Sequence, residues 1–282
     1  MRLGHFTLHT VECGRFRLDG GAMFGIIPKV LWARRMPADE RNRITMHMRA
    51  LLVEGLGRVV LIDNGAGDKY GAKFRDIFTL EGCTLDASLA RAGFQASDVT
   101  DVILTHLHFD HAGGSTKWHN GRAVPRFPNA RYFIQEAQLE SARQPNAREK
   151  ASFLPENFEP LAASGQLCAL RGRQELLPGL TVFPVHGHTE AQQLVRITGA
   201  EGTLVYVADL LPTVHHLRGP WVMAYDIRPL QTLREKSAFL EKAHAKDWQL
   251  FFEHDPDVAV ASLLKGARGI EAGKFRPLSE LF

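Results

Sequence analysis

The sequence is poor in cysteine, in long apolar runs and in net charge. Its 282 residues include three cysteines, Cys13, Cys83 and Cys168, which lie far apart and form no Cys-x-x-Cys pair. A thiolate zinc site and a disulfide framework are therefore disfavoured, and a reducing compartment is expected. The formal net charge is only +3 and no dense Lys/Arg stretch occurs, which argues against a nucleic-acid-binding surface.

Targeting segments and two common catalytic signatures are also missing. No apolar run approaches the length needed to cross a bilayer, and residues 1–6 lack the apolar core of a signal peptide. We therefore expect no membrane association and a cytoplasmic location. The sequence contains neither the Gly-x-Ser-x-Gly turn of serine hydrolases nor a phosphate-cradling P-loop. The 45% hydrophobic content supports a substantial core, and we expect one α/β domain over residues 1–282.

What the sequence does have is histidine, gathered in one stretch. His106, His108, Asp110 and His111 fill four of six consecutive positions, directly after the apolar, strand-like run of residues 101–104. In an extended backbone His106 and His108 point to the same side. Asp110 and His111 follow where the chain turns, so they can serve a second centre. Burying this cluster without a cation would leave several polar groups to satisfy, so the pattern favours a metal site.

The stretch resembles the His-x-His-x-Asp-His signature of the metallo-β-lactamase fold hydrolases. The form His-Leu-His-Phe-Asp-His-Ala-Gly-Gly is most similar to the quorum-quenching branch, the N-acyl homoserine lactonase-like enzymes. The resemblance implies a four-layer αββα sandwich with metals at one edge. It also implies three further ligands, each after an apolar run: His188, Asp209 and His254.

On this resemblance the seven ligands divide between two divalent cations. His106, His108 and His188 would hold one, and Asp110, His111 and His254 the other, with Asp209 shared. Imidazole and carboxylate ligands without thiolate suit Zn²⁺ first, with Mn²⁺, Fe²⁺ or Co²⁺ as alternatives. Two such ions about 4 Å apart can hold a bridging water and lower its pKa, which yields a nucleophilic hydroxide. Asp209 and Asp110 would be the catalytic carboxylates, with Asp110 passing a proton to the leaving group.

The reaction type is better defined than the substrate. The favoured substrate is a small molecule, a lactone or a related carboxylic ester. A thioesterase or a phosphotriesterase is an alternative, because one activated hydroxide serves all three reactions. A β-lactamase and an RNA-processing nuclease are less favoured. From other classes, a ligand-binding or sensing protein with little turnover and a di-iron redox protein are kept as alternatives. The redox members of the family carry Glu where this chain has His108, which favours hydrolysis.

The surroundings of the metals are less defined. The resemblance implies that Asp63 orients a ligand histidine, and a role in the turn alone is almost as favoured. The apolar segment 22–32 is predicted to be a loop, which either packs into the core or forms a wall of the substrate pocket or a subunit contact. Its wall candidates are Phe24 and Ile27, and a homodimer is possible.

One position departs from the best-known lactonases. They carry a tyrosine three residues past the shared aspartate, where this chain has Pro212. His215, His216 and Tyr225 are the candidate replacements in contact with substrate. A surface or packing role is the better expectation for each one taken alone.

Hydrophobic periodicity predicts strands and helices along most of the chain. The predicted strands are 3–11, 44–53 and 59–63 as a hairpin, 101–104, 132–134, 181–185, 204–208 and 250–252, the last clear one. The predicted helices are 84–92, 135–143 and 229–245. For the segment 144–170, with three prolines, periodicity does not decide between a helical excursion and an irregular loop.

Overall fold

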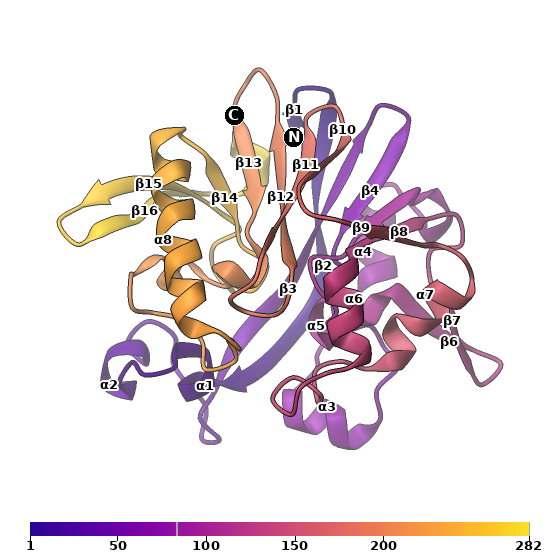
Figure 1. Cartoon of the computed structure of the whole chain (residues 1–282), viewed down its shortest axis with the longest axis horizontal. Helices are drawn as coiled ribbons and strands as arrows, with labels where there is room; N and C mark the ends of the chain where they lie inside the picture. The colour runs from indigo at the N-terminus through magenta and orange to yellow at the C-terminus, as the bar shows by residue number, and fades with distance from the viewer. Residues whose placement is uncertain (83, 282) are drawn as a thin grey trace.

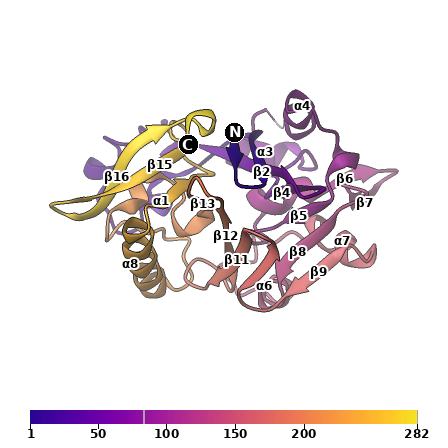
Figure 2. The same cartoon turned by 90° about the horizontal axis from the view of Figure 1, so that it is seen from above.

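Two mixed sheets pack face to face with helices outside them, so the predicted α/β sandwich is confirmed (Figures 1 and 2). The computed structural model describes residues 1–82 and 84–281. In order across the first seven-stranded sheet lie β1 (Arg2–Leu3), β2 (Phe6–Asp19), β3 (Arg43–Gly55), β4 (Arg58–Ile62), β5 (Asp101–Ile103), β8 (Arg131–Gln135) and β9 (Leu167–Leu170). The second consists of β10 (Gln174–Leu177), β11 (Leu180–Val185), β12 (Gln192–Thr198), β13 (Thr203–Tyr206), β14 (Gln249–Phe251), β15 (Val260–Gly266) and β16 (Gly269–Arg276).

Helices cover the outer faces of both sheets. Figure 2 shows α4 beside the first sheet and α8 beside the second, on opposite sides of the molecule. The helices are α1 (Gly20–Phe24), α2 (Lys29–Trp32), α3 (Ala72–Phe78), α4 (Leu85–Arg91), α5 (Phe109–Ala112), α6 (Glu136–Arg143), α7 (Glu159–Ala163) and α8 (Pro229–Ala245). A separate hairpin joins β6 (Thr116–His119) to β7 (Arg122–Pro125). Within residues 1–82 and 84–281, no helix has both the length and the apolar character that crossing a membrane requires.

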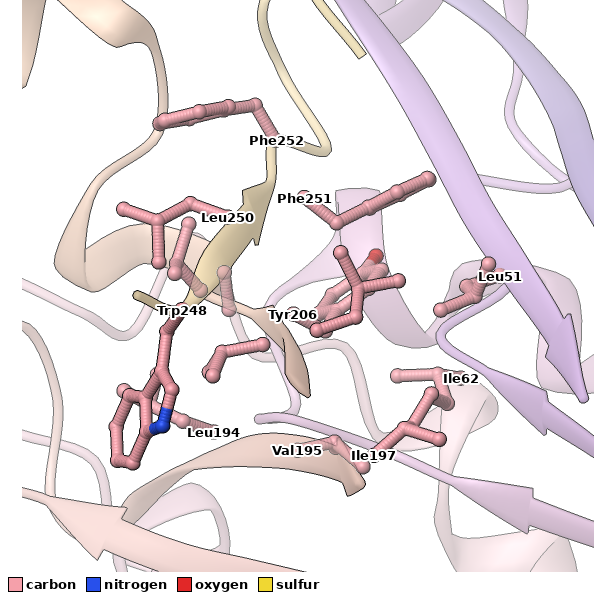
Figure 3. Close-up of a cluster of buried hydrophobic side chains, with 14 of the residues drawn as sticks. Leu51, Ile62, Leu194, Val195, Ile197, Tyr206, Trp248, Leu250, Phe251 and Phe252 are labelled. Atoms are coloured by element: carbon pink, nitrogen blue, oxygen red, sulfur yellow. The ribbon is translucent and has the colours of Figure 1, made fainter. Parts of the chain in front are cut away.

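The first sheet is buried on both faces, and successive residues of its strands alternate between two cores. Leu51 and Ile62 belong to the core between the sheets, whereas Leu52 and Leu61 belong to the core under the helices on the outer face. Figure 3 shows Leu51 and Ile62 opposite Tyr206 of the second sheet. This two-residue alternation is the reason that these segments read as near-continuous apolar runs in the sequence.

Parallel pairing brings the ends of the central strands to one edge of the sandwich. β4 pairs with β5 in parallel in the first sheet, and β13 pairs with β14 in parallel in the second. The carboxyl ends of parallel strands meet at the same edge of a sheet, which is where open α/β sheets build their sites. Side chains that follow β4, β5, β13 and β14 are thereby placed near one another.

Most of the predicted elements are present, including the β3–β4 hairpin, α4, α6 and α8. Three predictions were incomplete or wrong. The predicted strand 3–11 is divided by a turn at residues 4–5 into β1 and β2, and β2 continues to Asp19 through a register shift between Glu12 and Gly14. The segment 22–32 contains short helices, with exposed Ile26 between them and Pro28 just before α2. Strand β14 is followed by β15 and β16, whose many exposed side chains hide the strand pattern.

The undecided segment 144–170 is a mixture of irregular and regular structure. Residues 144–154 are irregular, and a 3₁₀ turn (Pro155–Asn157), α7 and β9 follow. The thiols of Cys13 and Cys168 are free, and Cys83 lies outside the described residues.

Candidate metal centre

Four of the candidate ligands converge at the edge where β5, β11 and β13 end. The ligand atoms of His106, His108, His188 and Asp209 are buried and lie within 4.8 Å of one another. His108 Nδ1 is 3.0 Å from His106 Nε2 and 3.2 Å from His188 Nε2. Asp209 Oδ2 is 3.1 Å from His188 Nε2. Three imidazole nitrogens and a carboxylate oxygen thus face one point, as the donor set of a divalent cation does.

A second group of three lies directly beside the first. The ligand atoms of Asp110, His111 and His254 are buried and also lie within 4.8 Å of one another. The Nε2 atoms of His111 and His254 are 3.0 Å apart. Asp209 is near both, with Oδ2 3.6 Å from His111 Nε2 and Oδ1 3.2 Å from His254 Nε2. The carboxylate of Asp209 is therefore shared between the two groups.

The charges of the two ligand clusters favour a positive charge, such as a bound cation, in the space between their side chains. Burial opposes charge on His188 and His254, yet the facing carboxylate of Asp209 raises the pKa of His188 to about 10 and that of His254 to about 9. Burial and the other imidazoles hold the pKa of His106 well below its usual value. Although Asp209 is also buried, the surrounding histidines keep the pKa of its carboxyl well below the usual range. These buried His/Asp groups are consistent with a dinuclear metal site.

The geometry of Asp209 also agrees with a dinuclear metal site. Its Oδ1 lies 3.2 Å from His254 Nε2 but is buried without a hydrogen-bond partner in residues 1–82 and 84–281. A buried acceptor is costly when unpaired, and a cation between Oδ1 and Nε2 would satisfy both atoms. The preceding Ala208 adopts a positive φ of 42°, a strained conformation for alanine that turns the chain just before this carboxylate.

The double glycine after the histidines provides a close approach of two backbone segments. A Cβ at Gly113 would lie 2.1 Å from the carbonyl oxygen of Ala66, and one at Gly114 would lie 2.2 Å from that of Asn64. Neither glycine has a positive φ, so the requirement here is space and not unusual dihedral angles. Because Asn64 N also donates to the carbonyl of His111, at 2.9 Å, this contact fixes the loop that carries the histidines.

Most of the ring nitrogens that face away from the clusters have partners. Asp63 Oδ2 lies 3.1 Å from His111 Nδ1, and the same carboxylate accepts from the backbone and side chain of Thr105 at 2.7 Å. Asp63 thus contacts a candidate ligand histidine, so its role is not limited to its own turn. His254 Nδ1 donates to the carbonyl of His47 at 2.7 Å. Such partners fix which nitrogen of a ligand histidine carries the proton.

Sequence reasoning missed two acidic partners of these histidines. Asp226 Oδ1 is 3.0 Å from His188 Nδ1, and Glu253 Oε2 is 3.0 Å from His111 Nδ1. Burial raises the pKa of Glu253 to about 7. Asp226 had no motif to mark it, whereas the position of Glu253 directly before His254 was a signal that could have been used.

A cavity of about 380 Å³ opens onto the two clusters. Asp110, Asp209 and His254 face it from the metal side, and Met23 and Tyr225 line its walls. Much of the remaining wall is apolar, from Leu18, Phe78, Phe109, Met223 and Ala224, with Arg148 and Glu149 as charged members.

The candidate substrate-contact residues lie in different places, and only some of them line the cavity. Tyr225 lines the cavity, but His215 lies beside a different surface pocket and His216 is buried, bonded to Thr213 and to the carbonyl of Met23. Phe24 is fully buried and stacked on His216, with ring centroids 5.0 Å apart, so it packs in the core. The half-buried Ile27 packs against that core as well. Met23, next to Phe24, supplies the cavity wall because neighbouring side chains of α1 point in different directions.

Comparison with known proteins agrees with this geometry. A family model of the metallo-beta-lactamase superfamily matches residues 49–260. A probable metallo-hydrolase of Mycobacterium tuberculosis is 24% identical over 247 residues, which cover 76% of each chain. A solved probable metal-dependent hydrolase from Staphylococcus aureus superposes with a TM-score of 0.90 at 29% identity, over 98% of this chain and 99% of that one.

A third relative shares the fold at lower identity. AidC, described as a dizinc quorum-quenching lactonase, superposes with a TM-score of 0.81 at 23% identity, over 98% of this chain and 97% of its own. The family model covers more than half of the chain and includes every candidate metal ligand from His106 to His254. The chain therefore belongs to the metallo-β-lactamase superfamily.

Proposed function

We propose that the chain is a dinuclear metal-dependent hydrolase that opens a lactone or a related carboxylic ester. The observation that carries the proposal is the position of Asp209. Its carboxylate lies 3.1 Å from His188 in one group and 3.2 Å from His254 in the other, at the floor of a cavity. A carboxylate shared by two sets of imidazoles is suited to holding two cations side by side. The proposed ligands are the seven predicted from the sequence.

Two bound divalent cations, with Zn²⁺ as the favoured metal, would supply Lewis acidity and an activated water. The chain supplies the remaining groups. Asp110 is buried against the cavity and can carry a proton to the leaving oxygen. Burial raises the pKa of Tyr225 to about 12, so its hydroxyl keeps its proton and can donate a hydrogen bond to a substrate oxygen. We propose Tyr225 as the replacement for the lactonase tyrosine.

The walls of the cavity support a neutral, partly apolar substrate. Arg148 is the one Lys or Arg side chain among the described lining residues, whereas Leu18, Phe78 and Met223 are apolar. A cavity of this kind accommodates an acyl chain better than it accommodates a polyanion. A lactone or ester with an apolar acyl group fits it, as does a small thioester or phosphotriester.

The test is an activity panel on metal-loaded protein, with metal content measured on the same sample. Acyl lactones, aryl esters, acyl thioesters and phosphotriesters form the panel, and His106→Ala is the blank. We expect two metals per chain and the highest kcat/KM on lactones or esters. Highest activity on a phosphotriester would reassign the substrate class. Two bound metals without turnover of any panel member would favour a binding role, and oxygen consumption with iron absorption would indicate a redox protein.

A further inference from the structure

His108 is the candidate ligand whose outward nitrogen lacks a bonded partner. Its Nδ1 faces His106 and His188, so its Nε2 points away from the cluster. This Nε2 is buried and has no hydrogen-bond partner in the part of the chain that the structure describes. A neutral imidazole that offers Nδ1 to a cation carries its proton on Nε2. Cation binding at the proposed site therefore creates a buried N–H donor that needs an acceptor.

The carboxylate of Glu149 is placed to accept a hydrogen bond from this N–H group. Its Oε1 lies 3.7 Å from His108 Nε2, beyond hydrogen-bond distance but within reach of a small ring rotation. Glu149 is only 3% exposed, and it accepts hydrogen bonds from Thr189 Oγ1, at 2.5 Å, and from the Asn146 side chain. Because Glu149 faces the outward nitrogen of His108, it is a positioning residue and not an additional ligand.

The segment around Glu149 also clamps the metal loops through its backbone and neighbouring side chains. Phe109 N donates to the carbonyl of Ser152 at 3.0 Å, and the ring of Phe153 lies 4.9 Å from that of His108. On the other side, Arg148 donates to the carbonyls of Ala224 and Asp226. Asp226 in turn holds His188 Nδ1, so residues 146–153 connect the loops that carry His108 and His188.

We propose that residues 146–153 form a clamp that closes on the first cation through the contact between Glu149 and His108. This inference rests on the proposed dinuclear site but adds a role for a segment without a sequence motif. Binding of the cation at Nδ1 and the hydrogen bond at Nε2 strengthen each other, because each favours the same tautomer of His108. The clamp is therefore tighter with metal than without it.

The first test measures metal affinity by competition with a chromophoric chelator. Loss of a partner that orients a ligand weakens metal binding by about 10- to 100-fold. We expect Glu149→Ala to lower the affinity for one of the two metals by that factor. The affinity for the other metal should stay within about 3-fold of the wild-type value. Glu149→Gln keeps an acceptor oxygen and should recover much of the loss. Glu140→Gln, an exposed acid on α6, is the matched control and should behave as wild type.

The second test uses wild-type protein and does not depend on the folding of a variant. Arg148 and Lys150 are exposed trypsin sites within the clamp. We expect cleavage after these residues to be at least about 10-fold slower in metal-loaded protein than after chelation, because proteolysis follows local opening. Wild-type metal affinity in Glu149→Ala, or cleavage at these sites that does not depend on metal, would overturn the clamp. Neither readout uses turnover, so absence of hydrolysis would sink the proposed function and leave this inference intact.

Discussion

At the scale of single residues, the candidate metal ligands could be predicted because they match the motifs of a known family. His106, His108, Asp110 and His111 share six positions, so their chemistry is visible in the sequence. Their partners are isolated acids that the fold brings in from a distance. Asp226 meets His188 across 38 residues, and Glu149 reaches His108 from an irregular segment. No periodicity or motif marks such residues, since their role exists only in the folded chain.

Replacement of Asp209 should weaken the binding of both metals. We expect Asp209→Asn to lower metal content below two per chain and kcat/KM by at least about 100-fold, because a neutral amide bridges two cations poorly. Metal analysis by mass spectrometry and single-substrate kinetics measure these effects. Asp257→Asn, an exposed position near the same loops, should change neither quantity. Two tightly bound metals in Asp209→Asn would contradict the shared-ligand role.

Tyr225 should affect turnover and leave metal binding unchanged. We expect Tyr225→Phe to lower kcat on the best substrate by about 100- to 1,000-fold, as loss of one donor to a developing oxyanion does. KM should change little, because the phenyl ring that remains still forms the cavity wall. Steady-state kinetics with parallel metal analysis separate these effects. A variant with unchanged kcat and raised KM would make Tyr225 a packing residue of the wall.

At the scale of elements, apolar patterning predicted most of the central strands but missed β12, which begins with two glutamines, and it failed at the margins. β4, β5 and β13 are buried on both faces and read as apolar runs. β9, β10 and β16 lie at the sheet edges or near them and carry exposed side chains, so their pattern is weak. The irregular residues 144–154 are held by contacts to distant loops, and local propensity carries no information about those contacts.

The loop that delivers Met223 and Tyr225 is held by one buried lysine. Lys236 of α8 donates to the carbonyls of His216, Arg218 and Trp221 at 3.0, 2.9 and 2.8 Å. Burial lowers the pKa of Lys236 to about 8. An unfolded lysine titrates near about 10.4, so between about pH 8 and 10 the unfolded chain holds this proton more tightly than the folded one. This group therefore makes the free energy of unfolding rise with pH in that window.

Lys236→Met should remove that contribution. We expect the free energy of unfolding of the wild type, relative to the variant, to rise between pH 8 and 10 by at most about 1.4 kcal/mol per pH unit. Urea denaturation at pH 7.5, 8.5 and 9.5 measures it. The exposed Lys265→Met is the control and should follow the wild type. Identical pH profiles for wild type and Lys236→Met would show that the lysine keeps its ordinary titration in the folded state.

At the scale of the whole molecule, the candidate ligands come from both sheets. His106 and His111 follow β5 of the first sheet, whereas Asp209 and His254 follow β13 and β14 of the second. Cations bound among them would join the two sheets at this edge. Whether the chain acts as a homodimer, as one domain or in the cytoplasm stays a prediction, for which gel filtration and cell fractionation are the measurements.

Chelation should therefore lower the thermal stability of the entire fold. A ligand at 100 times its Kd stabilises the native state by about 2.7 kcal/mol per site. For a chain of this size that corresponds to roughly 10 °C in Tm for two sites. Differential scanning calorimetry before and after chelation, with Zn²⁺ added back, measures the change. An unaltered Tm in protein shown to have lost both metals would mean that the sheets hold together without them.

The contact between the double glycine and the preceding turn has a consequence for how this sequence can vary through evolution. Positions 113 and 114 press backbone against backbone at Ala66 and Asn64, where a methyl group would overlap a carbonyl oxygen. A substitution at either site can be tolerated only if the facing turn also changes and makes room for the added side chain. Even alanine, otherwise the mildest replacement, should be selected against there, while exposed strand positions such as Lys117 and Arg122 on the neighbouring hairpin can vary freely.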